Sequence, residues 1–194
     1  GVGTDAKNSN VNAMHIGEAG LGLSDRDYYL EESETNAKIM EAYETYIKRI
    51  MTLAGKSDAE AERIWETLVR TERKFAEAKM TREQRRNPQA RYNEYSVAKL
   101  QAEFPYIDWK AYFSNLGTPD VDRVIVASPQ FMKALNEILP SLTDREIKDL
   151  VTVDAVSGVT GLLSDDFYDA SFELYDRVMS GKEEKEPRWK RAMG

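Results

Sequence analysis

The sequence predicts a mainly α fold, a multi-helix domain with long antiparallel helix pairs and a small β-hairpin or sheet. Three observations support this class. Apolar residues recur at helical spacing along most of the 194 residues. Several of these stretches open with helix-capping sequences, of which Ser57–Glu60 and Thr143–Glu146 are capping boxes. Strand-like patterns are confined to residues 1–16 and to a β-branched run at 121–127.

Bulk composition excludes several function classes. With 31% charged and 41% hydrophobic residues, the chain resembles an ordinary soluble protein that can bury one core, with room for two subdomains. A net charge of -7 argues against sequence-independent binding of nucleic acid. No apolar run approaches the length of a membrane span. The lack of cysteine excludes disulfides and thiolate metal sites. Because the chain opens without Met or a leader, we expect a fragment of a longer protein.

Residues 1–23 are expected to form a β-hairpin and an extended approach to the helices. Val2 and Thr4 alternate before a turn-rich run at 5–10, and residues 11–16 resume an extended pattern. His15 is the only histidine, and a zinc site would need two or three further ligands. We therefore favour a packed or hydrogen-bonded His15 over a ligand or a catalytic group.

The helical body, residues 24–194, is expected to begin with one long helix capped by Ser24 and ending near Gly55. The apolar stripe of this helix consists of Ile39, Tyr43, Tyr46, Ile47 and Ile50. The Ser57–Glu60 box opens a second helix, whose apolar side carries Ala61, Ile64, Trp65, Leu68, Phe75 and Ala76. A short connection predicts that the two helices pack antiparallel.

A short helix comes next, capped by Thr81 with Gln84 and stopped by Asn87-Pro88. It belongs to a basic cluster of Arg82, Arg85, Arg86 and Arg91 with Tyr92. The cluster could bind an anion or pair with acidic helices nearby, and we favour pairing. Residues 96–104 predict another short helix. Asp108 is expected to cap the next one, whose core face is Trp109, Tyr112 and Phe113.

The strand at 121–127 should join the hairpin in a small sheet, which brings the fold to about seven helices and one sheet. Ser128-Pro129 opens a helix with the stripe Phe131, Leu135, Ile138 and Leu139. The Thr143 box leads to Ile147, Leu150 and Val151, and Gly158 and Gly161 weaken the helical pattern beyond them. The last long helix should start at Ser164, end at Gly181 and bury Phe167, Ala170, Ser171, Leu174 and Val178.

No stretch carries recognisable catalytic chemistry. His-Glu-x-x-His and phosphate-loop motifs are absent. The acidic pairs Glu31/Glu32 and Asp165/Asp166 are adjacent in sequence, so on a helix their side chains diverge, and they suit helix N-termini. We therefore predict no catalytic, cofactor-binding or metal-ligating residue. The residues alone indicate a helical domain without a visible active site.

A resemblance to a known family rests on a series of segments in order along the chain. They are Asp5-Ala-Lys-Asn-Ser9, Gly20-Leu-Gly-Leu-Ser-Asp-Arg-Asp-Tyr-Tyr29, Arg86-Asn-Pro-Gln-Ala-Arg-Tyr-Asn93, Pro105-Tyr-Ile-Asp-Trp109, Val124-Ile-Val-Ala-Ser-Pro129, Leu163-Ser-Asp-Asp-Phe167 and Pro187-Arg-Trp-Lys-Arg191. Together they resemble the neprilysin-type zinc metalloendopeptidases, the group of neprilysin, endothelin-converting enzyme and bacterial oligopeptidase O. Val151–Asp154 departs from the family pattern. Ala192 replaces the cysteine of disulfide-bearing animal relatives, which favours a bacterial-type member.

The resemblance implies that residues 1–194 form a helical lid domain without catalytic residues. In this family a separate catalytic domain carries the zinc, with His-Glu-x-x-His and Glu-x-x-x-Asp, and no position here matches either motif. The implied partners are the protein's own C-terminal catalytic domain and peptide substrates, in an extracytoplasmic location: periplasmic, secreted or membrane-anchored. The alternative is a free-standing helical module that binds peptides or proteins and has no enzymatic activity.

Overall fold

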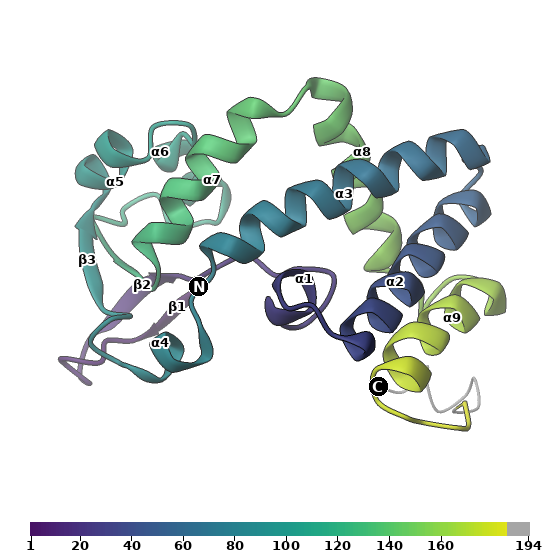
Figure 1. Ribbon diagram of the computed structural model, residues 1–194. Coiled ribbons are helices and arrows are strands. Elements are labelled where there is room, and N and C mark those ends of the chain that lie inside the picture. Colours follow the sequence, from purple (N-terminus) through teal and green to yellow (C-terminus); the bar gives the residue numbers. More distant parts are fainter. Residues whose placement is uncertain (186–194) are drawn as a thin grey trace. The chain divides into compact units, whose positions relative to one another are not determined.

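A computed structural model describes residues 1–185, which hold nine α-helices, one π-helix and four strands (Figure 1). The predicted mainly α class is confirmed. The expectation for Pro187–Arg191 lies outside the described residues. The chain divides into two compact units. Unit 1 comprises residues 1–26 and 74–141, and unit 2 comprises residues 27–73 and the described residues from 142 on.

Unit 1 is built on a four-stranded sheet in the order β1-β2-β4-β3. The predicted hairpin is present, with β1 (Val2–Thr4) antiparallel to β2 (Asn12–Ile16). The predicted second strand is β4 (Arg123–Val126), which pairs parallel with β2 and sets Met14 opposite Val124. A fourth strand, β3 (Asn93–Ser96), pairs antiparallel with β4 and was not predicted. Its sequence is largely polar, and its last residue also caps the next helix.

Four shorter helices complete unit 1: α4 (Arg82–Arg86), α5 (Val97–Glu103), α6 (Trp109–Asn115) and α7 (Pro129–Ser141). Their predicted caps are confirmed. Thr81 and Gln84 form the capping box of α4. Ser96 and Asp108 accept backbone N–H bonds at the starts of α5 and α6. The Ser128 hydroxyl accepts from the Phe131 N–H, 3.2 Å away, at the start of α7.

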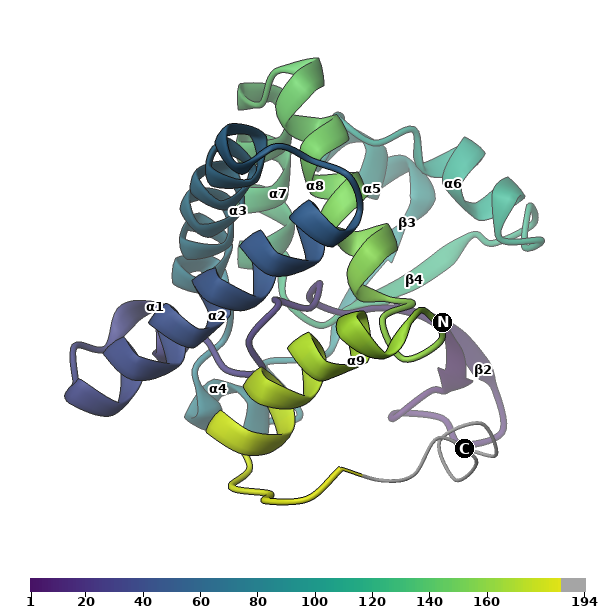
Figure 2. The same ribbon diagram turned by 90° about the vertical axis from the view of Figure 1, so that its right-hand side faces the viewer.

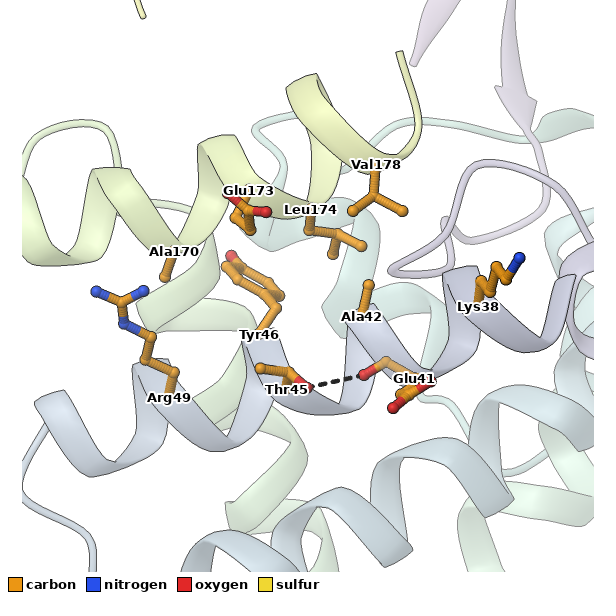
Figure 3. Close-up of a pocket in the computed structure, with 10 residues that line it drawn as sticks. All are labelled: Lys38, Glu41, Ala42, Thr45, Tyr46, Arg49, Ala170, Glu173, Leu174 and Val178. Carbon is orange, nitrogen blue, oxygen red and sulfur yellow. Dashed lines mark hydrogen bonds between the residues drawn. The ribbon is translucent and has the colours of Figure 1, made fainter. Parts of the chain in front are cut away.

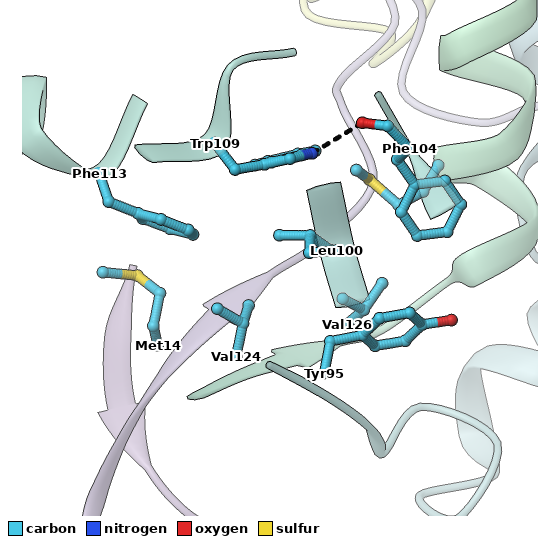
Figure 4. Packing of buried hydrophobic residues seen from close by; sticks show 9 residues of the cluster. Met14, Tyr95, Leu100, Phe104, Trp109, Phe113, Val124 and Val126 are labelled. Atoms are coloured by element: carbon cyan, nitrogen blue, oxygen red, sulfur yellow. Dashed lines mark hydrogen bonds between the residues drawn. The ribbon is translucent and has the colours of Figure 1, made fainter. Parts of the chain in front are cut away.

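The core of unit 1 lies between one face of the sheet and these helices (Figure 4). Its buried members are Met14, Tyr95, Leu100, Phe104, Trp109, Phe113, Val124, Val126 and Met132. The indole N–H of Trp109 donates to the Phe104 carbonyl at 2.8 Å, so this ring is both packed and hydrogen-bonded. The expected burial of Tyr112 was wrong. Trp109 and Phe113 fill the inner face of α6. The Tyr112 ring makes T-shaped contacts with both of them and is 43% exposed.

Unit 2 contains α1 (Asp27–Leu30), α2 (Glu34–Leu53), α8 (Asp144–Ser157), α9 (Asp165–Ser171) and the π-helix η1 (Phe172–Val178), while α3 (Asp58–Ala78) contributes residues to both units. The predicted stripe of α2 is buried. Gly55 ends the α2 region with a φ of 92°, a conformation that favours glycine. The Ser57–Glu60 box is formed, with the Glu60 carboxylate accepting from the Ser57 N–H.

The beginning of α2 differs from the prediction. A single helix from Ser24 to Leu53 was expected, but α1 stops at Leu30, and Ser33 caps α2 by accepting from the Asn36 N–H. The Asn36 side chain donates to the carbonyls of Asp27 and Glu31. The Asp27 carbonyl also accepts from the Glu31 N–H at 2.9 Å, so Asn36 adds a second bond there and binds the Glu31 carbonyl just beyond α1, which stabilises the break between the two helices.

The last predicted helix was also partly wrong. After Ser171 the backbone turns into η1, and the Met179 N–H donates to the Leu174 carbonyl five residues back. This register moves the buried face away from the 3.6-residue pattern. Phe172 is therefore 2% exposed, whereas Val178, expected in the core, is 39% exposed.

In α8 the expected burial of Val151 was wrong, since this side chain is 63% exposed. Asp149 is buried instead and accepts two 3.2 Å bonds from the Arg63 guanidinium on α3. Among residues 1–185, no helix is both long and apolar enough to cross a membrane.

Candidate functional site

A groove on the surface of unit 2 lies between α2 and the segment formed by α9 and η1 (Figure 3). We call it the α2–η1 groove, and its volume is about 300 Å³. Figure 2 shows α2 and α9 side by side. The groove is lined by the apolar or aromatic residues Ala42, Tyr46, Ala170, Leu174 and Val178, and by the polar residues Lys38, Glu41, Thr45, Arg49 and Glu173.

The apolar lining of the groove is mostly covered by its own neighbours. Ala170, Leu174 and Tyr46 are 2%, 1% and 3% exposed, whereas Ala42 on α2 is half-buried. The Tyr46 ring packs edge-on against Tyr175 with centroids 5.4 Å apart. The π-register of η1 keeps Val178 partly exposed, so the apolar lining continues to the open surface.

The charges of the groove are unevenly paired. Lys38 and Arg49 lie on α2 at opposite ends of the lining (Figure 3). The Lys38 ammonium is 2.6 Å from the Glu34 carboxylate. Arg49 forms no ion pair with another described residue. Burial raises the pKa of Tyr46 even though hydrogen bonds with Ser157, Thr160 and Ser171 oppose the shift, so its hydroxyl stays neutral at pH 7. The lining contains no nucleophile paired with a base.

A second polar cluster lies in unit 1 and links the turn after β1 to β4. Asp5, 3% exposed, accepts from the Arg123 guanidinium at 2.6 Å, the Tyr92 hydroxyl at 3.0 Å and the Lys7 backbone N–H at 2.8 Å. The Lys7 N–H and Arg123 lower the pKa of the Asp5 carboxyl to about 2. Every polar contact of this carboxylate is internal, so the cluster is structural. It was not predicted from the sequence, although an arginine within a β-branched strand was a signal of a buried partner.

The basic cluster is partly paired, which agrees with the favoured interpretation. Arg82 and Arg85 place guanidinium nitrogens 2.9 Å and 3.8 Å from the Asp25 carboxylate. Arg91 donates to the Arg85 carbonyl. The acidic partner precedes α1 and is not part of a helix. The structure does not gather these arginines into an anion site with Tyr92, whose hydroxyl bonds to Asp5.

His15 lies on β2, and its ring packs against Gly3 of β1, where a Cβ would meet it at 3.4 Å. Its Nε2 is buried without a hydrogen-bond partner in the described part of the chain. Within residues 1–185 no group of three or more His, Asp or Glu side chains could hold a metal ion.

Comparison with known proteins decides the family. All 194 residues match the N-terminal family profile described as Peptidase family M13. The chain belongs to peptidase family M13. This M13 chain is 28% identical to endothelin-converting enzyme 1 of Homo sapiens, over 97% of its own length and 25% of that protein. It is 26% identical to Neprilysin-3 of Drosophila melanogaster, again over 97% of the chain and 25% of that protein. The resemblance inferred from the sequence segments is confirmed.

Solved structures share the fold of the M13 chain. It matches the zinc metalloprotease ZMP1 of Mycobacterium tuberculosis, solved with an inhibitor, at 27% identity and a TM-score of 0.91, over 98% of this chain and 29% of that one. The open state of ZMP1 gives a TM-score of 0.90 over 30% of that chain. PEPO from Lactobacillus rhamnosis, at 20% identity, a TM-score of 0.75 and coverage of 98% and 30%, shows the fold alone. The chain spans about a quarter of the length of the curated relatives it matches.

Proposed function

We propose that this chain is the non-catalytic lid of a zinc metalloendopeptidase that hydrolyses peptide bonds in oligopeptides, and that it encloses part of the substrate chamber. The observation that carries the proposal is the match of the entire chain to family M13, together with a TM-score of 0.91 to a zinc metalloprotease. The proposed partners are peptide substrates and a catalytic domain in the same longer protein, in an extracytoplasmic location.

The residues of this chain do not fit a catalytic zinc. Such a site usually takes three protein ligands and keeps a further position open for water. The chain has one histidine and no cysteine, and the His15 Nε2 is buried next to Gly3. The zinc, its ligands and the general base are therefore assigned to the catalytic domain. The role left to this chain is to control access and to position substrate, neither of which needs a reacting group.

The experiment is a reversible lock in the full-length enzyme. This chain contributes no cysteine of its own, so one cysteine introduced here and one in the catalytic domain form a single defined disulfide once any native cysteine elsewhere in the enzyme is replaced. Activity should fall on oxidation and return on reduction, since a closed lid blocks entry and release. Each single-cysteine variant, treated in the same way, is the control. A locked enzyme that cleaves large and small peptides at undiminished rates would contradict the proposal.

A free-standing binding module is the alternative function, and the α2–η1 groove is the observation that favours it. Such a module would bind a peptide without any zinc domain. The complete reading frame separates the two: a His-Glu-x-x-His motif downstream supports the lid, and its absence supports the module.

A further inference from the structure

We propose that the α2–η1 groove is the binding site of an amphipathic helix that belongs to the same longer protein and lies outside this chain. The inference rests on the proposed function for its partner, the remainder of the peptidase. It adds a defined surface and a defined chemistry to that partnership.

The shape of the groove suits a third helix. Ala42 on α2 lies across from Leu174 and Val178 of η1 (Figure 3), and a small, half-buried residue at this point lets another backbone approach closely. Tyr46 follows Ala42 by four residues, and Val178 follows Leu174 by four, so each wall presents a helical row. Lys38 and Arg49 are separated along α2 by roughly 16 Å at the rise of an α-helix, the length of about three turns.

The chemistry of the groove specifies the character of that helix. Half of its lining residues are apolar or aromatic, and among these Val178 remains 39% exposed, which calls for an apolar side chain in the occupant. Arg49 is exposed and forms no ion pair with another described residue, so it is available to a carboxylate of the occupant at its end of the groove. Glu41 favours a cation between the two ends, while the Glu173 carboxylate already lies 3.3 Å from the Arg177 guanidinium; both disfavour an acidic residue there.

The extent of the site favours a segment of the same polypeptide over a separate partner. Five apolar or aromatic residues in an open groove offer little area, and a free peptide would lose its translational freedom on binding. A helix in the same chain is already present at a high effective concentration. The M13 relatives have about three quarters of their length outside the matched region, which is ample to supply one.

Thiol labelling in the longer protein tests this inference. Thr45→Cys puts a probe at the groove, where Thr45 is exposed and its hydroxyl donates to the Glu41 carbonyl at 3.0 Å. Thr152→Cys on α8 is the matched control, because the Thr152 hydroxyl makes the same bond four residues back, to Lys148 at 2.8 Å, and its side chain is only half-exposed. Each rate of maleimide modification is divided by the rate of the same variant unfolded in guanidinium.

We expect the groove position to react at least about tenfold more slowly than the control, although Thr45 is the more exposed in this chain alone. Arg49→Glu should raise the Thr45→Cys rate severalfold, while Arg145→Glu on α8 should not. Equal reactivity at both positions would overturn the inference. Protection that appears only with added peptide substrate, or only at high protein concentration, would also overturn it, in favour of a substrate or of a second copy.

Peptidase activity, measured on the same samples, keeps the two proposals distinct. If the enzyme is active and zinc-dependent but the groove position is unprotected, the lid function is supported and the docked helix is contradicted. If the groove position is protected but the longer protein shows no zinc-dependent turnover, the docked helix is supported and the lid function is contradicted.

Discussion

The Arg123 guanidinium donates to the Asp5 carboxylate at 2.6 Å, although the two residues are 118 positions apart. Asp5 follows β1 and Arg123 opens β4, so the pair fastens the hairpin turn to the strand on the far side of β2. Tyr92, which precedes β3, donates its hydroxyl to the same carboxylate and so links a third part of the sheet to it. Breaking a buried ion pair leaves an unpaired charge inside the protein and is destabilising. Protonation of Asp5 breaks this pair, so the stability of unit 1 is expected to fall at low pH.

Acidification should destabilise unit 1 through Asp5. The pKa of this carboxyl is lowered from 3.8 to about 2 by the Lys7 N–H and Arg123, so the unfolded chain binds the proton first as the pH falls. The contribution of Asp5 to stability is therefore present above about pH 4 and is lost as the pH falls to about 2. Urea midpoints between pH 5 and pH 2 should decline less steeply for Asp5→Asn than for the parent. The exposed Asp120→Asn is the control, and an unchanged slope in Asp5→Asn would contradict the assignment.

The second prediction concerns the packing of α2 against α3. Trp65 is 6% exposed and meets the Tyr43 ring edge-on, with centroids 5.3 Å apart. Trp65→Ala should lower the free energy of unfolding by roughly 3–5 kcal/mol, from lost burial and the cavity left behind. The exposed neighbour Glu66→Ala should cost well under ~1 kcal/mol. Guanidinium titrations that return equal midpoints would show that the buried face of α3 is wrongly placed.

The start of α2 can be tested by removing its cap. Ser33 accepts from the Asn36 N–H at 3.0 Å, so Ser33→Ala should destabilise the protein by about 1 kcal/mol. Ser24→Ala, at the position where the sequence suggested a cap, should have a much smaller effect. Far-ultraviolet circular dichroism during thermal unfolding measures both. A larger loss for Ser24→Ala would restore the single long helix.

Metal dependence is the fourth prediction. The isolated 194-residue chain should show no zinc-dependent cleavage of a quenched fluorescent peptide, because it has one histidine and no cysteine to supply ligands. The full-length enzyme should cleave the same peptide and lose activity with a chelator. Chelator-sensitive turnover by the isolated chain would be incompatible with a lid lacking catalytic groups.

Local signals were readable from the sequence because each involves only neighbouring residues. The boxes at Thr81 and Thr143, and the caps at Ser96 and Asp108, depend on groups three residues apart. The family resemblance was likewise readable because it rests on short segments in a fixed order along the sequence. The lid role itself stays a proposal.

Features that depend on distant partners were not readable. Strand β3 is a strand because β4 pairs with it, and its own residues lack the β-branched pattern. The change from α-helix to π-helix at Phe172 could not be predicted, because the spacing of apolar residues there fits an ordinary α-helix. Ala170 and Leu174 were correctly assigned to the core, but Val178, expected on the same buried face, is 39% exposed at the groove. The exposure of Val178 depends on what packs above it.

The order of the two units along the chain has a consequence for how this protein is made and dissected. The chain passes from one unit to the other after residues 26, 73 and 141, so each unit is assembled from two separate stretches of sequence. During synthesis β2 must wait for β4 to emerge, more than 100 residues later, before the sheet can close. No single truncation point yields one clean unit. A chain cut after residue 141 keeps all of unit 1 but removes η1, which packs against α2. Part of the apolar stripe of α2 is then exposed and can promote aggregation. A deletion experiment would wrongly attribute the resulting loss of soluble protein to a function of the deleted segment.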